Sequence, residues 1–130
     1  MTTGLEDFFK DCRKNLPAAE GLCNELSRKL PPSYINFLKF SNGIEGSVSN
    51  GSYLRLWKAE DLEKLNTTSQ SETFVPGMFL IGSDGGEEKI GIDLRENSVT
   101  FGNFFRVSSI PLDWKQAVLL GSEVTDIKII

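Results

Sequence analysis

The segment Leu30–Gly43, LPPSYINFLKFSNG, constrains the fold of this 130-residue chain most, because it marks both ends of a helix. Proline has no N–H and is tolerated only in the first turn of a helix, so Pro31 and Pro32 place a helix start there. Large apolar side chains follow at helical spacing, and Asn42 and Gly43 offer the left-handed backbone that ends helices. The segment therefore predicts a helix that is buried on most sides and carries no chemistry of its own.

Apolar spacing in the rest of the chain predicts helices at its two ends and strands between them. The expected helices cover residues 3–14, 17–29, 58–66 and 111–120. The expected strands cover residues 44–48, 53–57, 78–82, 88–94 and 99–107, with residues 125–130 as a further edge strand. The polar segment 67–76 is expected to be a loop. This order predicts an α+β fold, a single domain over residues 1–130 with a mainly antiparallel sheet flanked by helices at its N- and C-terminal ends.

Charge and hydropathy limit the partners and the compartment. The net charge of −4 argues against a nucleic-acid partner, which needs a concentrated basic face, and it suits a basic protein partner. No apolar run approaches the roughly 20 residues that a membrane span needs, so no membrane partner is expected. The N-terminus lacks the basic region and apolar stretch of a secretory signal, and we therefore expect a cytoplasmic protein.

The chain contains no histidine, which restricts its chemistry sharply. Catalysis by Ser/His/Asp or Cys/His groups is excluded, and so are most zinc sites. Cys12 and Cys23 are not spaced as a CxxC motif and are expected to be reduced, structural thiols. We therefore expect a protein that is not an enzyme, with no catalytic residues, no cofactor and no metal site.

One expected strand near the middle of the chain carries a candidate binding surface. Its alternation points Leu54 and Leu56 to one face and Tyr53, Arg55 and Trp57 to the other. If the leucines face the core, the other three residues form an outward patch of a composition that is enriched at binding hot spots. If helices cover both faces, the aromatic residues are simply buried, which is the more ordinary fate of such residues.

The acidic, glycine-rich segment Gly82–Glu88, GSDGGEE, is a second candidate site. A phosphate-binding loop would end in Gly-Lys-Ser/Thr and precede a helix, whereas this segment carries carboxylates and precedes a strand. Asp84, Glu87, Glu88 and Asp93 offer oxygen ligands to a divalent cation, but their spacing is not that of an EF-hand loop. The favoured interpretation is a hairpin turn with a solvated acidic rim, which leaves the rim available for partner contact.

Three motifs, taken in order, resemble the SUKH superfamily, the group related to the fungal cell-wall assembly regulator Smi/Knr. The matching residues are Leu30-Pro31-x-x-Tyr34-x-x-Phe37-Leu38-x-x-x-Asn42-Gly43, then Leu54-Arg55-Leu56-Trp57-x-x-Glu60-Asp61-Leu62, then Gly82-x-x-Gly85-Gly86-Glu87 before an Ile-x-Ile-Asp strand. The resemblance covers roughly residues 20–120. It implies an antiparallel sheet flanked by helices and no established catalytic residues. It also implies that bacterial members are often immunity proteins against toxins, and that eukaryotic members look like regulatory scaffolds.

These observations support three hypotheses about function. The first is a non-enzymatic immunity protein that neutralises a cognate bacterial toxin by direct contact. The alternative is a regulatory scaffold that binds a host protein or peptide through the sheet face. The third, with the least support, is a ligand- or metal-binding domain that uses carboxylates such as Asp84, Glu87 or Asp93. The expected partner-binding residues are Tyr53, Arg55, Trp57, Asp84, Glu87 and Glu88.

Overall fold

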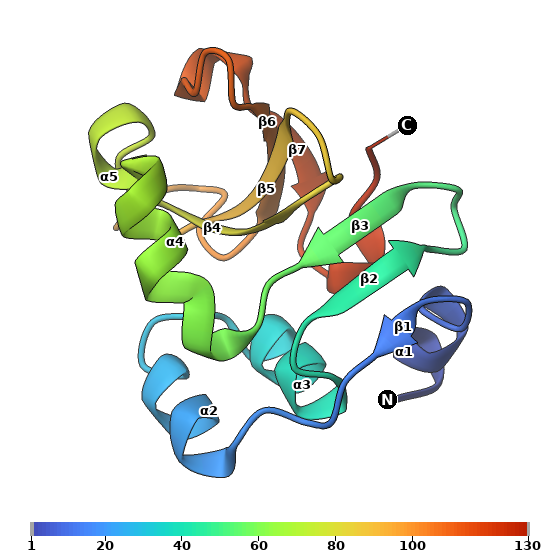
Figure 1. The fold of residues 1–130 in the computed structure, drawn as a ribbon. Coiled ribbons are helices and arrows are strands. Elements are labelled where there is room, and N and C mark those ends of the chain that lie inside the picture. Colours follow the sequence, from blue (N-terminus) through green and yellow to red (C-terminus); the bar gives the residue numbers. More distant parts are fainter. Residues whose placement is uncertain (1, 130) are drawn as a thin grey trace.

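In the computed structural model, which describes residues 2–129, seven strands form one antiparallel sheet (Figure 1). Each strand pairs with its neighbours in the sequence, so the strand order is β1-β2-β3-β4-β5-β6-β7. The strands are β1 (Arg13–Lys14), β2 (Ile44–Ser47), β3 (Tyr53–Leu56), β4 (Met78–Ser83), β5 (Glu88–Asp93), β6 (Phe104–Ser108) and β7 (Val118–Gly121). The expected α+β fold with an antiparallel sheet is confirmed.

The helices flank this sheet, with α1, α2 and α3 gathered on the side of β2 and β3 and α4 and α5 beside β4 (Figure 1). The α-helices are α1 (Thr2–Phe8), α2 (Glu20–Leu26), α3 (Pro32–Phe40), α4 (Leu62–Ser69) and α5 (Ser71–Phe74). Short 3-10 helices are η1 (Ala59–Asp61), η2 (Trp114–Gln116) and η3 (Val124–Asp126). Within residues 2–129, no helix has both the length and the apolar character that crossing a membrane would require.

Helix α3 is the buried helix that its sequence predicts. Pro32 lies in its first turn, and Tyr34, Phe37 and Leu38 are completely buried. The rings of Tyr34 and Phe37 stack with their centroids 5.3 Å apart. Gly43 has φ +81°, and a side chain there would approach the backbone carbonyl of β3 to 2.9 Å. Helix α3 therefore ends where the chain must pass close to the sheet, which only glycine allows without strain.

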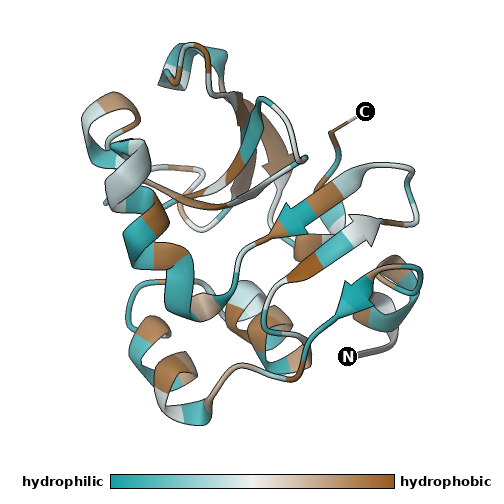
Figure 2. Cartoon of the chain, viewed as in Figure 1, coloured by the Kyte–Doolittle hydropathy of each residue, from teal (hydrophilic) through white to brown (hydrophobic). Residues whose placement is uncertain are grey.

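Two hydrophobic clusters lie on the two faces of the sheet. The larger cluster packs α1–α3 against one face and includes Leu54, Leu56, Ile81, Ile90, Ile92 and Phe104. The smaller cluster covers β4–β6 on the other face and comprises Val75, Met78, Leu80, Phe105 and Val107, with Leu112, Trp114 and Ala117 packed against it. Figure 2 shows the consequence in the strands: β4 is largely hydrophobic, whereas β3 alternates between hydrophobic and hydrophilic residues. One half of the sheet is thus buried on both faces, and the other half on one.

The side-chain amide of Asn66 hydrogen-bonds to the edge of β4 beyond the point where β3 ends. Strand β3 pairs with β4 only through Arg55 with Ser83 and Leu56 with Gly82. Beyond these pairs, the buried Asn66 of α4 accepts a hydrogen bond from the Leu80 N–H (2.8 Å) and donates one to the Leu80 carbonyl (2.9 Å). The amide therefore satisfies the two backbone groups that a neighbouring strand would otherwise pair with.

Several expected elements in the first half of the chain differ in the structure. The helix expected over 3–14 ends at Phe8, because the chain turns to pair β1 with β2 and to bury Cys12 beside that hairpin. The helix expected over 17–29 is the shorter α2. The loop expected over 67–76 contains the end of α4 and all of α5. The polar sequence predicts a loop, but its serine at position 71 is buried, and this Ser71 donates its hydroxyl proton to the Asn66 side chain (2.9 Å).

The second half of the chain differs more from the elements that its sequence predicts. The strand expected over 99–107 begins only at Phe104, and Val99 and Phe101 are exposed in the preceding turns. The helix expected over 111–120 is wrong, because that segment forms η2 and then β7, which completes the sheet beside β6. The expected edge strand over 125–130 is wrong where the structure describes it, since η3 and a tail up to residue 129 occupy this region, and residue 130 lies outside the described residues.

The Tyr34→Phe variant is expected to be more stable than the wild type by about 1 kcal/mol, because a buried hydroxyl without a partner keeps its desolvation cost. Within residues 2–129, the hydroxyl oxygen of Tyr34 is buried and has no hydrogen-bond partner. Urea unfolding of both proteins measures the difference. A loss of stability in Tyr34→Phe would contradict the prediction and show that the hydroxyl is hydrogen-bonded in solution.

Candidate protein-binding surface

The outward residues of β3 form the first part of the candidate site. Leu54 and Leu56 are buried in the larger cluster, whereas Tyr53 is 40% exposed and the Arg55 side chain 50% exposed. Helices α1–α3 pack with Leu54 and Leu56 on the opposite face, and among residues 2–129 the smaller cluster on this face contains no residue of β3. The structure therefore places Tyr53 and Arg55 on the surface. This is the arrangement expected if the leucines of the strand face the core.

Glu45 on β2 joins these two residues into one hydrogen-bonded group. It lies directly opposite Arg55 in the β2–β3 register. The Tyr53 hydroxyl donates to the Glu45 carboxylate, and Arg55 Nη2 donates to the same oxygen over 3.2 Å. The hydrogen bonds from Tyr53 and Arg55 hold the pKa of Glu45 below its ordinary value. The hydrogen bond to Glu45 raises the pKa of Tyr53. We call Glu45, Tyr53 and Arg55 the hairpin triad.

Sequence reasoning missed Glu45, and the expected hairpin did not contain the signal. The expected strands 44–48 and 53–57 leave four residues between them, which would place residue 45 opposite residue 56. In the structure Ser47 pairs with Tyr53 and Glu45 with Arg55, which is one residue out of that register. Opposite charges on directly paired residues are a stabilising cross-strand arrangement, but this rule finds Glu45 only once the register is known.

Trp57 occupies a different position from the other two predicted residues of its strand. It is half-buried and packs against both hydrophobic clusters. The ammonium of Lys89 lies 5.9 Å from the centroid of its ring. Trp57 therefore stands at the boundary between the uncovered and the covered half of the sheet face, where it serves packing and leaves only part of its ring for a partner.

The acidic turn between β4 and β5 lies next to the hairpin triad. Asp84 Oδ1 accepts a hydrogen bond from the Gly86 N–H (2.7 Å), which fixes the turn. A side chain at Gly85 would contact the Tyr53 ring at 3.5 Å, so this turn and Tyr53 are neighbours. Glu87 is exposed, whereas Glu88 pairs with Arg106 on β6 over 3.2 Å. The structure thus brings the turn at Asp84 and Gly85 to the triad, leaves Glu87 exposed further along the same turn, and holds Glu88 in an intramolecular ion pair.

Asp93, the carboxylate named by the ligand-binding hypothesis, is fully buried by its own chain. Arg95 Nε donates to Oδ1 and Arg95 Nη2 to Oδ2, each over 3.0 Å, and the hydroxyls of Ser98 (2.7 Å) and Thr100 (2.6 Å) donate to Oδ2. Burial raises the pKa of Asp93, but these hydrogen bonds outweigh it and hold the pKa below its ordinary value. Across residues 2–129, no group of three or more Asp, Glu, Cys or His side chains is placed to hold a metal ion.

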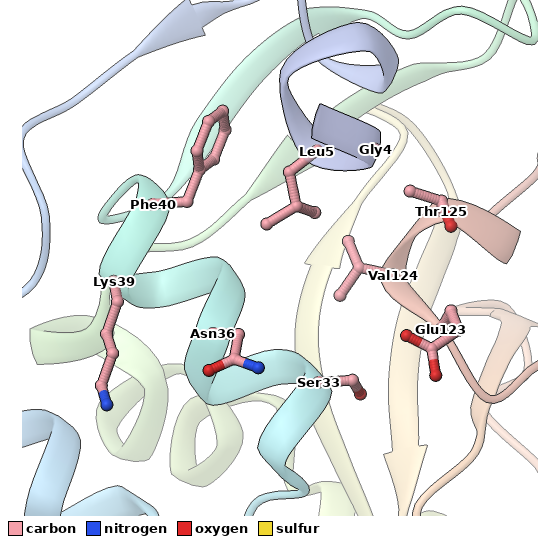
Figure 3. Close-up of a pocket in the computed structure, with 9 residues that line it drawn as sticks. All are labelled: Gly4, Leu5, Ser33, Asn36, Lys39, Phe40, Glu123, Val124 and Thr125. Atoms are coloured by element: carbon pink, nitrogen blue, oxygen red, sulfur yellow. The ribbon is translucent and has the colours of Figure 1, made fainter. Parts of the chain in front are cut away.

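A hollow of about 510 Å³ lies on the other side of the molecule, between α1, α3 and η3 (Figure 3). Leu5 and Val124 point into it, Phe40 lies at its edge, and Lys39 and Glu123 lie at its opposite sides. The hollow and the hairpin triad lie on opposite faces of the sheet, because α3 and η3 pack with the larger cluster. No sequence pattern indicated it, since its walls come from three separate segments.

Comparison with known proteins places most of the chain in a family. The model of the SMI1 / KNR4 family (SUKH-1) matches residues 20–126. No curated protein matches the chain in sequence. The matched range contains all three motifs on which the resemblance rests, including α3, the β3 strand and the acidic turn. The chain therefore belongs to the SMI1 / KNR4 family (SUKH-1).

Proposed function

We propose that this chain is a non-enzymatic immunity protein that neutralises a cognate bacterial toxin by direct contact. Membership of the SMI1 / KNR4 family (SUKH-1) supports the class of function. The observation that carries the proposal is the hairpin triad, an ordered Tyr–Arg–Glu group on the sheet face opposite to α1–α3. Tyrosine and arginine are the residue types that most often dominate binding energy at protein interfaces.

The geometry of the triad suits a pre-organised interface. Tyr53 and Arg55 are both held by Glu45, so less side-chain entropy is lost when a partner fixes them. The acidic turn beside Tyr53 adds negative charge through Asp84 and the exposed Glu87, and the whole chain carries a net charge of −4. Such a surface complements a basic patch on a toxin, and complementary charge raises association rate and selectivity more than affinity.

The test is co-expression with the toxin encoded next to the gene of this protein. Wild-type protein should restore growth and form a complex with the toxin. The double variant Tyr53→Ala/Arg55→Ala should lose the complex, because two hot-spot residues of about 2 kcal/mol each correspond to roughly a 1000-fold weaker binding. Both side chains are exposed, so the variant should keep its fold.

Phe101→Ala is the matched control, because Phe101 is an aromatic residue with 54% exposure in the turns before β6. It should bind the toxin as the wild type does. Failure of the wild-type protein to rescue growth and to form a complex would overturn the proposal. Specific capture of a housekeeping protein of the same cell through the triad, in place of a toxin, would favour the scaffold alternative.

A further inference from the structure

An apolar groove lies on the same sheet face as the hairpin triad, over its covered half. The groove has a volume of about 430 Å³ and runs between α5 and the segment that follows β6. Leu80 of β4 belongs to its lining, as do Phe74 of α5 and Ile110 and Leu112 from the segment after β6. Phe74 is 50% exposed and Ile110 72% exposed, so two large apolar side chains of the groove lining meet water.

The packing of the chain does not account for these exposed side chains. The smaller cluster beneath them is already closed by Leu112, Trp114 and Ala117. Phe74 and Ile110 are not among the residues that form it or pack against it. Grouped apolar surface at a hollow is a mark of an interaction site, unlike single exposed apolar residues.

Lys89 gives the groove a charge. It lies in the groove lining and is half-buried. Among residues 2–129, its ammonium makes no ion pair and no side-chain hydrogen bond, and it lies 5.9 Å from the Trp57 ring. The nearest acidic residue in sequence, Glu88, is paired with Arg106. A half-buried cation that forms no ion pair among the described residues, set beside apolar side chains, is complementary to a carboxylate brought by a binding partner.

The strand register connects this groove to the hairpin triad. Arg55 on β3 lies opposite Ser83 on β4, Ser83 opposite Lys89 on β5, and Lys89 opposite Val107 on β6. Residues in such a row share one face of a sheet, with neighbouring strands about 4.8 Å apart. The triad and the groove are therefore two parts of one continuous surface, with Lys89 between them.

We propose that the groove receives an apolar side chain of a partner protein, and that an adjacent carboxylate of the partner pairs with Lys89. The inference rests on the proposed function, because it names the chemistry of the partner at the same sheet face. The partner surface would then carry two features: a basic patch for the triad and its acidic rim, and an acidic residue next to an apolar anchor for the groove.

Small probes test the groove independently of any toxin. 3-Phenylpropionate carries an aromatic ring and a carboxylate, and 3-phenylpropanamide is its neutral counterpart. In NMR titrations of the full chain, both should shift the backbone amides of Phe74, Lys89 and Ile110, and the acid should bind roughly two- to fivefold more tightly, as expected for a partly exposed ion pair. Shifts confined to other regions, or no shifts with either probe, would overturn the proposal.

Three variants test whether the probes bind in the groove and pair with Lys89. Lys89→Gln should abolish the preference for the acid over the amide. Ile110→Ser should weaken the binding of both probes roughly tenfold, because it removes apolar contact area. Leu119→Ser is the control, because Leu119 is 49% exposed on β7, outside the groove lining. An unchanged preference in Lys89→Gln, or equal weakening in Leu119→Ser, would contradict the assignment.

The same variants separate this inference from the proposed function. If wild-type protein neutralises the toxin, Ile110→Ser and Lys89→Gln should weaken the complex. Unchanged binding by both variants would overturn the proposed role of the groove and leave the proposed immunity function intact. If wild-type protein neutralises no toxin, the proposed function fails. The NMR titrations then still decide whether the groove selects apolar groups that carry an anion.

Discussion

Replacing Asp93 with asparagine is expected to lower the free energy of unfolding by about 3 kcal/mol, since hydrogen bonds to a buried charged group are the costliest to lose. Asparagine has nearly the same size but no negative charge, and its NH₂ group would face the donors of Arg95, Ser98 or Thr100. These donors order the turns between β5 and β6, and Arg95 also lies 3.7 Å from the centroid of the Trp114 ring. Urea unfolding followed by tryptophan fluorescence measures the loss.

The pH dependence of the same variant identifies the cause. Folding lowers the pKa of Asp93, so its contribution is present above the unfolded-state pKa of about 3.9 and is lost as the pH falls from there toward the folded-state pKa. The wild type should therefore lose stability below about pH 4 more steeply than Asp93→Asn. Glu96→Gln, an exposed carboxylate in the same turns, is the control and should change neither the stability nor the acid profile appreciably. Equal stability of wild type and Asp93→Asn at neutral pH would contradict the account.

The Asn66→Ala variant is also expected to lose about 3 kcal/mol, because it leaves the N–H and the carbonyl of Leu80 buried without partners. The Asn66 amide is fully used: Nδ2 donates to Leu62 O and Leu80 O, and Oδ1 accepts from Leu80 N–H and Ser71 Oγ. Alanine can replace none of these bonds. The change is measured by urea unfolding, and hydrogen exchange of the Leu80 amide should accelerate with it.

Asn36→Ala is the matched control, because Asn36 is exposed on α3 and alanine favours helices. It should leave stability unchanged or slightly higher. A loss in Asn36→Ala as large as that in Asn66→Ala would show that the effect comes from removing any helical asparagine, and the sheet-edge account would be wrong.

The parts of the fold that the sequence predicts well are those where local residues decide the outcome. Helix α3 has its start and stop in its own sequence, and the β2–β3 hairpin has its turn in Asn50 and Gly51. The inward and outward residues of β3 follow from simple alternation. The strand pair around the acidic turn follows from apolar runs on both sides of it.

The parts that could not be predicted depend on distant partners. Val118–Gly121 has the composition of a helix or a strand, and only the free edge of β6 decides for a strand. The segment 67–76 gains helical order from the Ser71–Asn66 contact, which sequence polarity conceals. The groove needs α5 and the segment after β6 to meet over β4, and these lie more than 30 residues apart. Trp57 is expected within the strand and on its outer face, but β3 ends at Leu56 and Trp57 packs half-buried against both clusters.

The short seam between β3 and β4 has a consequence for how partner choice could evolve. Two residue pairs join these strands, and at one of them, Gly82, any side chain would overlap the carbonyl oxygen of Arg55. The hairpin triad lies on one side of this seam and the groove on the other. A substitution at Gly82 would therefore alter the spacing and angle between two anchoring points without touching either. If the proposed surface binds its partner at both points, selectivity among related partners would diverge through a residue that has no side chain of its own.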